Sequence, residues 1–232
     1  MSFAVGDDED RVRTNRQRFV ERLGVSPESV IAGRLTHGNE VSVFSDNDCA
    51  AWPIAETLYC GESSQPDRWF PSDGVVSNVP GLHFLLTFAD CVPLAFVDRR
   101  SGAIGAAHAG WRGTAKGIAR EVVRAMEREF GSNPADLAVA IGPSIGPCCY
   151  SVKPEVVGVF ATNAEIHSVA YPHGTPMLDL WETNRLQVLD SGVQPDSIEI
   201  ARVCTACHTE TYYSHRGESG RTGRFAMCIG LS

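Results

Sequence analysis

The stretch GLHFLLTFADCVPLAFVDRRSGAIGAAHAGWRG, residues 81–113, contains three apolar runs that predict three successive buried strands. The runs cover residues 82–88, 92–97 and 103–107. Cys91 lies between the first two runs, and His108 ends the third. Small residues surround both, so the backbone there can approach a ligand or a metal closely. A thiol and an imidazole at consecutive strand ends suit a metal site or a nucleophile–base pair, although a buried thiol beside a core histidine would have the same spacing.

Outside this stretch, helical and strand patterns alternate along the chain. This alternation predicts one mixed α/β domain over residues 1–232, with a β-sheet core flanked by helices. The predicted helices cover residues 7–23, 114–130, 154–160 and 179–191. The further predicted strands cover residues 31–35, 41–44, 137–142, 198–203 and 224–231. Residues 45–72 have no clear periodicity and are predicted to form an irregular insertion or a binding loop.

The composition is that of an ordinary globular protein, with 43% hydrophobic and 21% charged residues. The net charge of −8, without any run of Lys and Arg, argues against a nucleic-acid partner. No apolar stretch is long enough to span a bilayer, and the acidic start MSFAVGDDED does not resemble a signal peptide. We therefore expect a cytoplasmic protein with no membrane partner, in which the eight cysteines are thiols or metal ligands. The sequence predicts no particular oligomeric state.

The segment Cys204-Thr205-Ala206-Cys207-His208 matches the attachment pattern of a c-type haem. Covalent haem attachment belongs to exported proteins, which this sequence does not resemble. The two cysteines could instead form half of a zinc ribbon with Cys228 and a histidine such as His215, but the spacing fits no standard template. We interpret them as two structural thiols at a strand end, and expect neither haem nor a second zinc. The Gly-x-Gly-x-x-Gly and Walker patterns are absent, and we do not expect a Ser–His–Asp hydrolase.

Several short motifs occur together in a specific order. They are Ala-Asp-Cys-Val-Pro at 89–93, Ala-His-Ala-Gly-Trp-Arg-Gly at 107–113, Ile-Gly-Pro at 141–143, Cys-Cys-Tyr at 148–150, Tyr-Ser-His-Arg at 213–216 and Thr-Gly-Arg at 222–224. Together they resemble the YfiH-like laccase-domain proteins, also described as polyphenol oxidases, purine nucleoside phosphorylases or peptidoglycan editing factors. The likeness runs from about residue 5 to the C-terminus. It implies an α/β fold similar to that of Cys-His hydrolase-like toxin domains, with strands between helices.

The resemblance also implies a metal site. A histidine in a His-Gly turn, the Ala-Asp-Cys cysteine and the His-Ala-Gly-Trp histidine correspond to His37, Cys91 and His108. Three nitrogen and sulfur ligands with an open fourth position are what a catalytic zinc requires, and copper is the alternative metal. Among the catalytic residues we also include Asp90 and Arg112. Asp90 would orient a ligand or carry a proton, or would only support the ligands as a structural carboxylate.

Phosphate binding requires cationic side chains near the metal. Arg112, Arg216 and Arg224 are the expected anion-binding residues, because guanidinium groups hold phosphate with directed hydrogen bonds. Arg216 and Arg224 could alternatively only make salt bridges. Asn39 is grouped with them as a substrate-binding residue.

The resemblance implies a zinc-dependent purine nucleoside phosphorylase that acts on adenosine, inosine and S-methyl-5′-thioadenosine, with adenosine deaminase activity. Its partners would be a purine nucleoside and phosphate. The alternatives are an amide hydrolase that edits peptidoglycan precursors, a weak copper-dependent polyphenol oxidase and a non-enzymatic binding protein with a structural metal. A multicopper oxidase needs about ten histidines, and the chain has seven. Phe88, Ser151 and Gly217 depart from the family pattern and bear on the identity of the substrate.

Overall fold

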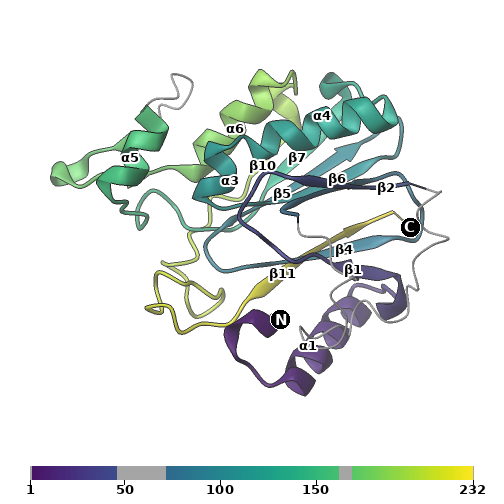
Figure 1. The fold of residues 1–232 in the computed structure, drawn as a ribbon, viewed down its shortest axis with the longest axis horizontal. Helices are drawn as coiled ribbons and strands as arrows, with labels where there is room; N and C mark the ends of the chain where they lie inside the picture. Colours follow the sequence, from purple (N-terminus) through teal and green to yellow (C-terminus); the bar gives the residue numbers. More distant parts are fainter. Residues whose placement is uncertain (1, 46–71, 162–168, 232) are drawn as a thin grey trace.

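The computed structural model describes residues 2–45, 72–161 and 169–231, and Figure 1 shows these residues arranged in four layers. Two helical layers enclose two β-sheets that are stacked face to face. The expected α/β fold with sheets between helices is therefore confirmed, although the sequence did not indicate that the strands divide into two sheets. The irregular stretch expected at 45–72 lies almost entirely outside the described residues.

The larger sheet has six strands in the order β10-β7-β5-β6-β3-β2. The neighbours β5–β7, β5–β6 and β3–β6 are antiparallel, whereas the outer pairs β10–β7 and β2–β3 are parallel. The strands are β2 (Val41–Phe44), β3 (Gly74–Ser77), β5 (Val92–Asp98), β6 (Ile104–Ala109), β7 (Leu137–Ile141) and β10 (Ile198–Ile200). The two predicted runs at 92–97 and 103–107 thus become the central hairpin of this sheet.

The smaller sheet has three strands in the order β1-β4-β11. They are β1 (Val30–Ala32), β4 (His83–Phe88) and β11 (Phe225–Gly230). A separate two-stranded hairpin is formed by β8 (Val169–Ala170) and β9 (Met177–Leu178). Because β4 and β5 follow one another in the chain but belong to different sheets, the connection at residues 89–91 passes from one layer to the next.

Helices cover both outer faces. α4 (Ile118–Phe130) and α6 (Leu180–Asp190) lie over the larger sheet, and α1 (Glu9–Arg22) lies against the smaller one (Figure 1). α3 (Trp111–Ala115) precedes α4, and α5 (Pro154–Ala161) projects from the body of the molecule. Short 3-10 turns cover Phe3–Val5, Pro27–Ser29, Pro134–Asp136, Pro172–Gly174 and Pro195–Ser197. None of the described helices is long and apolar enough to cross a membrane.

Three apolar clusters fill the spaces between the layers. The largest joins α4 and α6 to the six-stranded sheet, with Val122 and Met126 fully buried. A second lies between the sheets and contains Phe84 and Ile104. The third, smaller cluster joins α1 to the three-stranded sheet through Val20. Because burial of apolar area is the main stabilising term, both sheets depend on helical cover.

Three predicted elements differ from the structure, each for a local reason. The helix expected over 114–130 is two helices, because Gly117 has a left-handed backbone (φ 78°) that ends one and starts the other. The strand expected at 198–203 ends at Ile200, since Arg202 also has a positive φ of 51°. The strand expected at 31–35 ends at Ala32, because the following loop turns toward Asp73.

Candidate functional site

The register of the larger sheet brings three site residues to one end of it. In the β5–β6 pair, Val92 lies opposite Ala109, so Cys91 sits beside the start of the helix that follows β6. In the β3–β6 pair, Gly74 lies opposite Ala107, and the backbone carbonyl of Asp73 accepts a hydrogen bond from the His108 amide at 2.7 Å. Hydrogen-bonded strands therefore set the relative positions of these groups.

Asp73 connects the two histidines of the site. Its carboxylate is fully buried, and Oδ1 lies 2.8 Å from Nδ1 of His108. Oδ2 accepts hydrogen bonds from the backbone amides of Thr36 and Gly38 at 2.9 and 2.8 Å, and from the Thr36 hydroxyl at 2.7 Å. These bonds hold the loop that presents His37, whose backbone is left-handed at φ 59°. Asp73 was not predicted, because no strand was expected at 74–77 and its two histidine partners lie far from it in the sequence.

His37, Cys91 and His108 come together as the sequence resemblance implied. One potential ligand atom from each lies within 4.8 Å of the others. The two imidazole rings meet edge to face, with centroids 5.1 Å apart. His37 is exposed, Cys91 half-buried and His108 buried, so the group opens to solvent on the His37 side.

Cys91, His108 and Asp73 shift one another's pKa values toward the charged forms. Burial would raise the pKa of the Cys91 thiol, but the neighbouring charge of His108 and hydrogen bonds from both histidines lower it to about 6. Burial would lower the pKa of His108, yet the Cys91 thiolate and Asp73 raise it to about 9. Burial would likewise raise the pKa of Asp73, but hydrogen bonds from His108, Gly38 and Thr36 keep it well below its usual range. A thiolate is thus available near neutral pH.

The donor set fits a metal ion. The His108 ring uses Nδ1 for Asp73, which leaves Nε2 as the nitrogen that can coordinate a metal. A carboxylate behind a histidine in this way fixes the orientation of the ring at many zinc sites. A thiolate and two imidazoles are also the ligand types that zinc prefers.

Two glycines allow the close approach of these segments. A Cβ on Gly110 would lie 3.0 Å from Sγ of Cys91, and a Cβ on Gly113 would lie 2.8 Å from the carbonyl oxygen of Gly38. The second contact is with backbone, which cannot move aside as a flexible side chain can. The glycines of the His-Ala-Gly-Trp-Arg-Gly motif are therefore required by packing around the site.

A cavity of about 710 Å³ opens over the three residues. This volume suits a small-molecule ligand. Among the described residues, five arginines line it, namely Arg16, Arg34, Arg112, Arg216 and Arg224. A cluster of cations in a protein of net charge −8 favours an anionic ligand. All three arginines predicted from the sequence reach the cavity, whereas Arg16 and Arg34 were not predicted.

The three predicted arginines differ in their contacts. Nη1 of Arg216 donates to the carbonyl and hydroxyl oxygens of Ser151 at 2.9 and 3.0 Å. Nη1 of Arg224 donates to the backbone carbonyls of residues 222 and 223. The Arg112 guanidinium stacks over the ring of Trp111 at 4.4 Å and donates no hydrogen bond to another residue within the described part of the chain. Of these three arginines, Arg112 therefore has the most donors left for a ligand.

Asp90 has a strained backbone that other residues stabilise. Its φ is 85°, a left-handed value that costs a non-glycine residue about 1–3 kcal/mol. Its carboxylate accepts hydrogen bonds from the hydroxyls of Thr205 and Ser214, both at 2.7 Å, and from the Arg216 amide at 2.6 Å. The backbone carbonyl accepts from the Ile145 amide at 3.0 Å. Both carboxylate oxygens are therefore engaged in holding the loops around Cys91.

Asn39 and Ser144 lie apart from the cavity lining. Asn39, expected to bind substrate, donates from Nδ2 to the backbone carbonyl of Lys116 at 3.0 Å. Gly-Pro-Ser-Ile-Gly at 142–146 does match the Gly-x-Ser-x-Gly pattern of hydrolases. Ser144, however, is fully buried, and its hydroxyl accepts a hydrogen bond from the Trp181 indole at 2.6 Å, so it is not exposed as a nucleophile.

Comparison with known proteins identifies the family of this chain. The profile of the family described as multi-copper polyphenol oxidoreductase laccase matches residues 1–232. The chain belongs to this laccase family. Its relatives include a protein of Geobacillus stearothermophilus named purine nucleoside phosphorylase YlmD, which is 37% identical over 237 residues, covering 99% of this chain and 82% of the relative.

A second relative and a solved structure extend the comparison. A protein from an unknown prokaryotic organism, named adenosine deaminase RL5, is 32% identical over 225 residues, covering 94% of this chain and 82% of the relative. The crystal structure of YlmD from G. stearothermophilus superimposes with a TM-score of 0.89 at 36% identity. That match covers 100% of this chain and 84% of the other.

The departures from the laccase-family pattern have local structural roles. Phe88 is fully buried and stacks on Phe225, with ring centroids 5.8 Å apart. It also lies 5.4 Å from the His108 ring, so it packs behind a site residue. Ser151 accepts hydrogen bonds from Arg216. Gly217 leaves no room for a side chain, because a Cβ there would lie 2.8 Å from the Thr209 methyl group.

Proposed function

We propose that this protein is a zinc-dependent purine nucleoside phosphorylase that cleaves adenosine, inosine and S-methyl-5′-thioadenosine with phosphate, and that it also deaminates adenosine. The observation that carries the proposal is one cavity in which a His/Cys ligand set lies beside five arginines. The names of the relatives support it, because they include a purine nucleoside phosphorylase and an adenosine deaminase.

His37, Cys91 and His108 are the zinc ligands of this proposal. Their ligand atoms lie within 4.8 Å of one another, and Asp73 orients the His108 ring. Bound there, zinc would supply Lewis acidity to a ligand in its open fourth position. Copper is the alternative occupant of the same three ligands.

In phosphorolysis, a phosphate oxygen forms a bond to C1′ of the ribose while the C1′–N bond breaks and its electron pair leaves with the purine. Positive charge develops on the ribose, and the phosphate must be held in line with the breaking bond. Arg112 holds the phosphate, since it lines the cavity and its guanidinium has no hydrogen-bond partner among the described residues. Arg216 and Arg224 contribute positive potential while their own hydrogen bonds keep them in place.

The rest of the cavity suits a nucleoside. Trp111 and Tyr150 line it and offer aromatic surface for a purine ring. Ile145 and Leu180 add apolar area that excludes water from the glycosidic bond. Asp90 is a positioning residue in this scheme, because both of its oxygens hold neighbouring loops instead of facing a substrate alone.

The phosphate role of Arg112 can be tested directly. Arg112→Gln removes the charge but keeps a side chain of similar reach, so we expect kcat/KM for phosphate to fall about ten- to a hundredfold, as for a lost charge-assisted hydrogen bond. Zinc content and Tm should remain those of the wild type. The matched control is Arg124→Gln, because Arg124 is exposed on α4 and pairs with Glu121. Unchanged phosphate kinetics together with a lower Tm would instead identify Arg112 as a structural residue.

The close packing beneath the His37 loop gives a second test. Gly113→Ala would place a methyl group 2.8 Å from the Gly38 carbonyl and displace the loop that carries His37. We expect zinc affinity to fall by about tenfold although no ligand is removed, an effect typical of residues that support metal ligands. Gly158→Ala in α5 is the control, since a Cβ there has nothing within 4 Å. Titration with a chelator measures the zinc affinity of both variants. Equal affinities would show that the position of the His37 loop does not affect zinc binding.

A further inference from the structure

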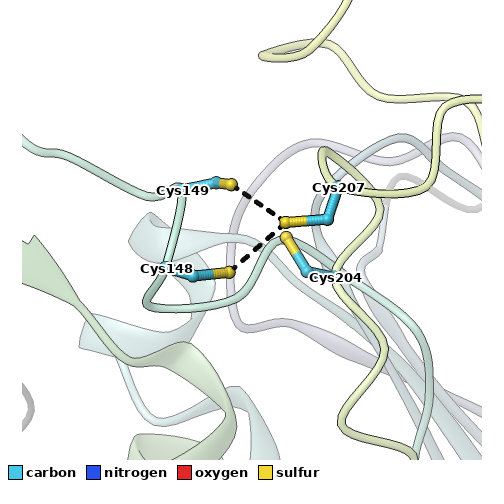
Figure 2. Close-up of side chains that lie close together, drawn as sticks. All are labelled: Cys148, Cys149, Cys204 and Cys207. Carbon is cyan, nitrogen blue, oxygen red and sulfur yellow. Dashed lines mark hydrogen bonds between the residues drawn. The ribbon is translucent and has the colours of Figure 1, made fainter.

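Four cysteines from two loops converge at a place separate from the His/Cys site. Cys148 and Cys149 follow β7, and Cys204 and Cys207 follow β10. Figure 2 shows the two pairs facing each other. Sγ of Cys207 lies 3.3 Å from that of Cys149 and 3.7 Å from that of Cys148, and all four sulfurs lie within 4.8 Å of one another.

Hydrogen bonds between the two loops hold this arrangement. The Ser144 amide donates to the Val203 carbonyl at 3.2 Å, and the Thr205 amide donates to the Ser144 carbonyl at 3.1 Å. The Gly146 amide donates to Sγ of Cys204 at 3.2 Å. The backbone hydrogen bonds thus bring the thiols together by themselves. A ligand would need to order the two loops only slightly further.

The spacing suits a tetrahedral metal ion. With zinc–sulfur bonds of about 2.3 Å, the sulfurs of a four-cysteine zinc site are about 3.8 Å apart. The sulfur–sulfur distances of 3.3 and 3.7 Å and the upper limit of 4.8 Å bracket this value. We propose that Cys148, Cys149, Cys204 and Cys207 bind a second, structural zinc ion with all four positions filled by thiolates.

This inference replaces our interpretation of Cys204 and Cys207 as two structural thiols. The zinc ribbon considered for the sequence would pair Cys204 and Cys207 with Cys228 and His215. In the structure, Cys148 and Cys149 lie beside them instead. A single disulfide would explain only two of the four thiols, and all four are free. One tetrahedral zinc ion would use all four sulfur atoms as ligands.

Such a zinc ion would stabilise one wall of the cavity. The loop with Cys148 and Cys149 continues to Tyr150, and the loop with Cys204 and Cys207 continues to Arg216, both of which line the cavity. Both loops also hydrogen-bond to Asp90, next to Cys91. A metal that joins the loops would therefore keep this wall ordered without taking part in the reaction.

The test measures zinc in full-length protein purified anaerobically with a reductant and without chelator. In a Cys91→Ser background, which disables the first site, we expect about one zinc per chain, with an X-ray absorption spectrum of four sulfur neighbours at about 2.3 Å. Cys207→Ser in the same background should lose this zinc and lower Tm by several degrees. The exposed Cys148→Ser should do the same and serves if Cys207→Ser does not fold.

Cys228→Ser is the matched control, because Cys228 lies in β11 outside both clusters, and it should keep the zinc. In the otherwise wild-type chain, Cys207→Ser should remove one zinc whether or not the first site is occupied, so this result is independent of the proposed function. Full zinc content in both Cys207→Ser and Cys148→Ser would overturn the inference. So would a metal-free cluster in the reduced protein, or a Cys149–Cys207 disulfide in peptide maps of the anaerobic preparation.

Discussion

Cys91→Ser is expected to lower kcat/KM for adenosine phosphorolysis by about a thousandfold, because it removes the only thiolate of the proposed catalytic zinc site and with it the zinc. The charge of His108 and hydrogen bonds from both histidines stabilise this thiolate near neutral pH, and a serine hydroxyl would stay protonated there. Steady-state kinetics and elemental analysis of the same preparations measure the effect.

Cys228→Ser is the control for this change, since its thiol lies in β11 and belongs to neither cysteine site. It should retain the wild-type rate. Cys91→Ser protein that keeps both its rate and its full zinc content would contradict the assignment of Cys91 as a ligand.

Asp73→Asn should have the largest effect on stability. The fully buried carboxylate accepts three hydrogen bonds from the His37 loop and faces Nδ1 of His108. An amide of the same shape loses the charge and one acceptor, so we expect a loss of about 3 kcal/mol, or roughly 6–12 °C in Tm for a chain of this size. Zinc affinity should fall about ten- to a hundredfold with it.

The buried Asp73 carboxylate also makes the stability of the protein depend on pH. Because the pKa of Asp73 is lower in the folded than in the unfolded protein, its contribution is present above the unfolded carboxyl pKa of about 4 and is lost as the pH falls toward the folded value. Wild-type stability should therefore decrease below about pH 4 more steeply than that of Asp73→Asn.

The control for Asp73 is Asp190→Asn, because Asp190 forms an exposed ion pair with Arg120 and should contribute less than about 1 kcal/mol. Thermal unfolding of the three proteins between pH 3 and 7 would give the comparison. If Asp73→Asn melted with the wild type at every pH, Asp73 would not organise the site.

Much of the fold follows from local sequence patterns. Apolar runs predicted β4, β5 and β6, and the acidic cap Asp179 predicted the start of α6, where its side chain accepts from the Glu182 amide. Patterns of this kind report burial along one segment. They do not report which strands pair, so the division into two stacked sheets was not predicted.

The same distinction explains the site. The resemblance in sequence identified three site residues, His37, Cys91 and His108, and in the structure they lie together. Asp73 was missed because its role depends on the pairing of β3 with β6, and β3 itself was not predicted. The four-cysteine cluster was missed for a similar reason, since Cys149 and Cys207 are 58 residues apart and meet only through loop pairing.

The most direct test of the proposed function is product analysis of the zinc-loaded protein with adenosine, with and without phosphate. We expect ribose 1-phosphate only when phosphate is present, in an amount equal to the sum of free adenine and the hypoxanthine released from inosine. We also expect inosine, formed without any need for phosphate. Chromatography and phosphorus NMR resolve these products, and Cys91→Ser run in parallel should form neither ribose 1-phosphate nor inosine. Absence of ribose 1-phosphate in the wild-type reaction, or equal amounts of it in the Cys91→Ser reaction, would contradict the account.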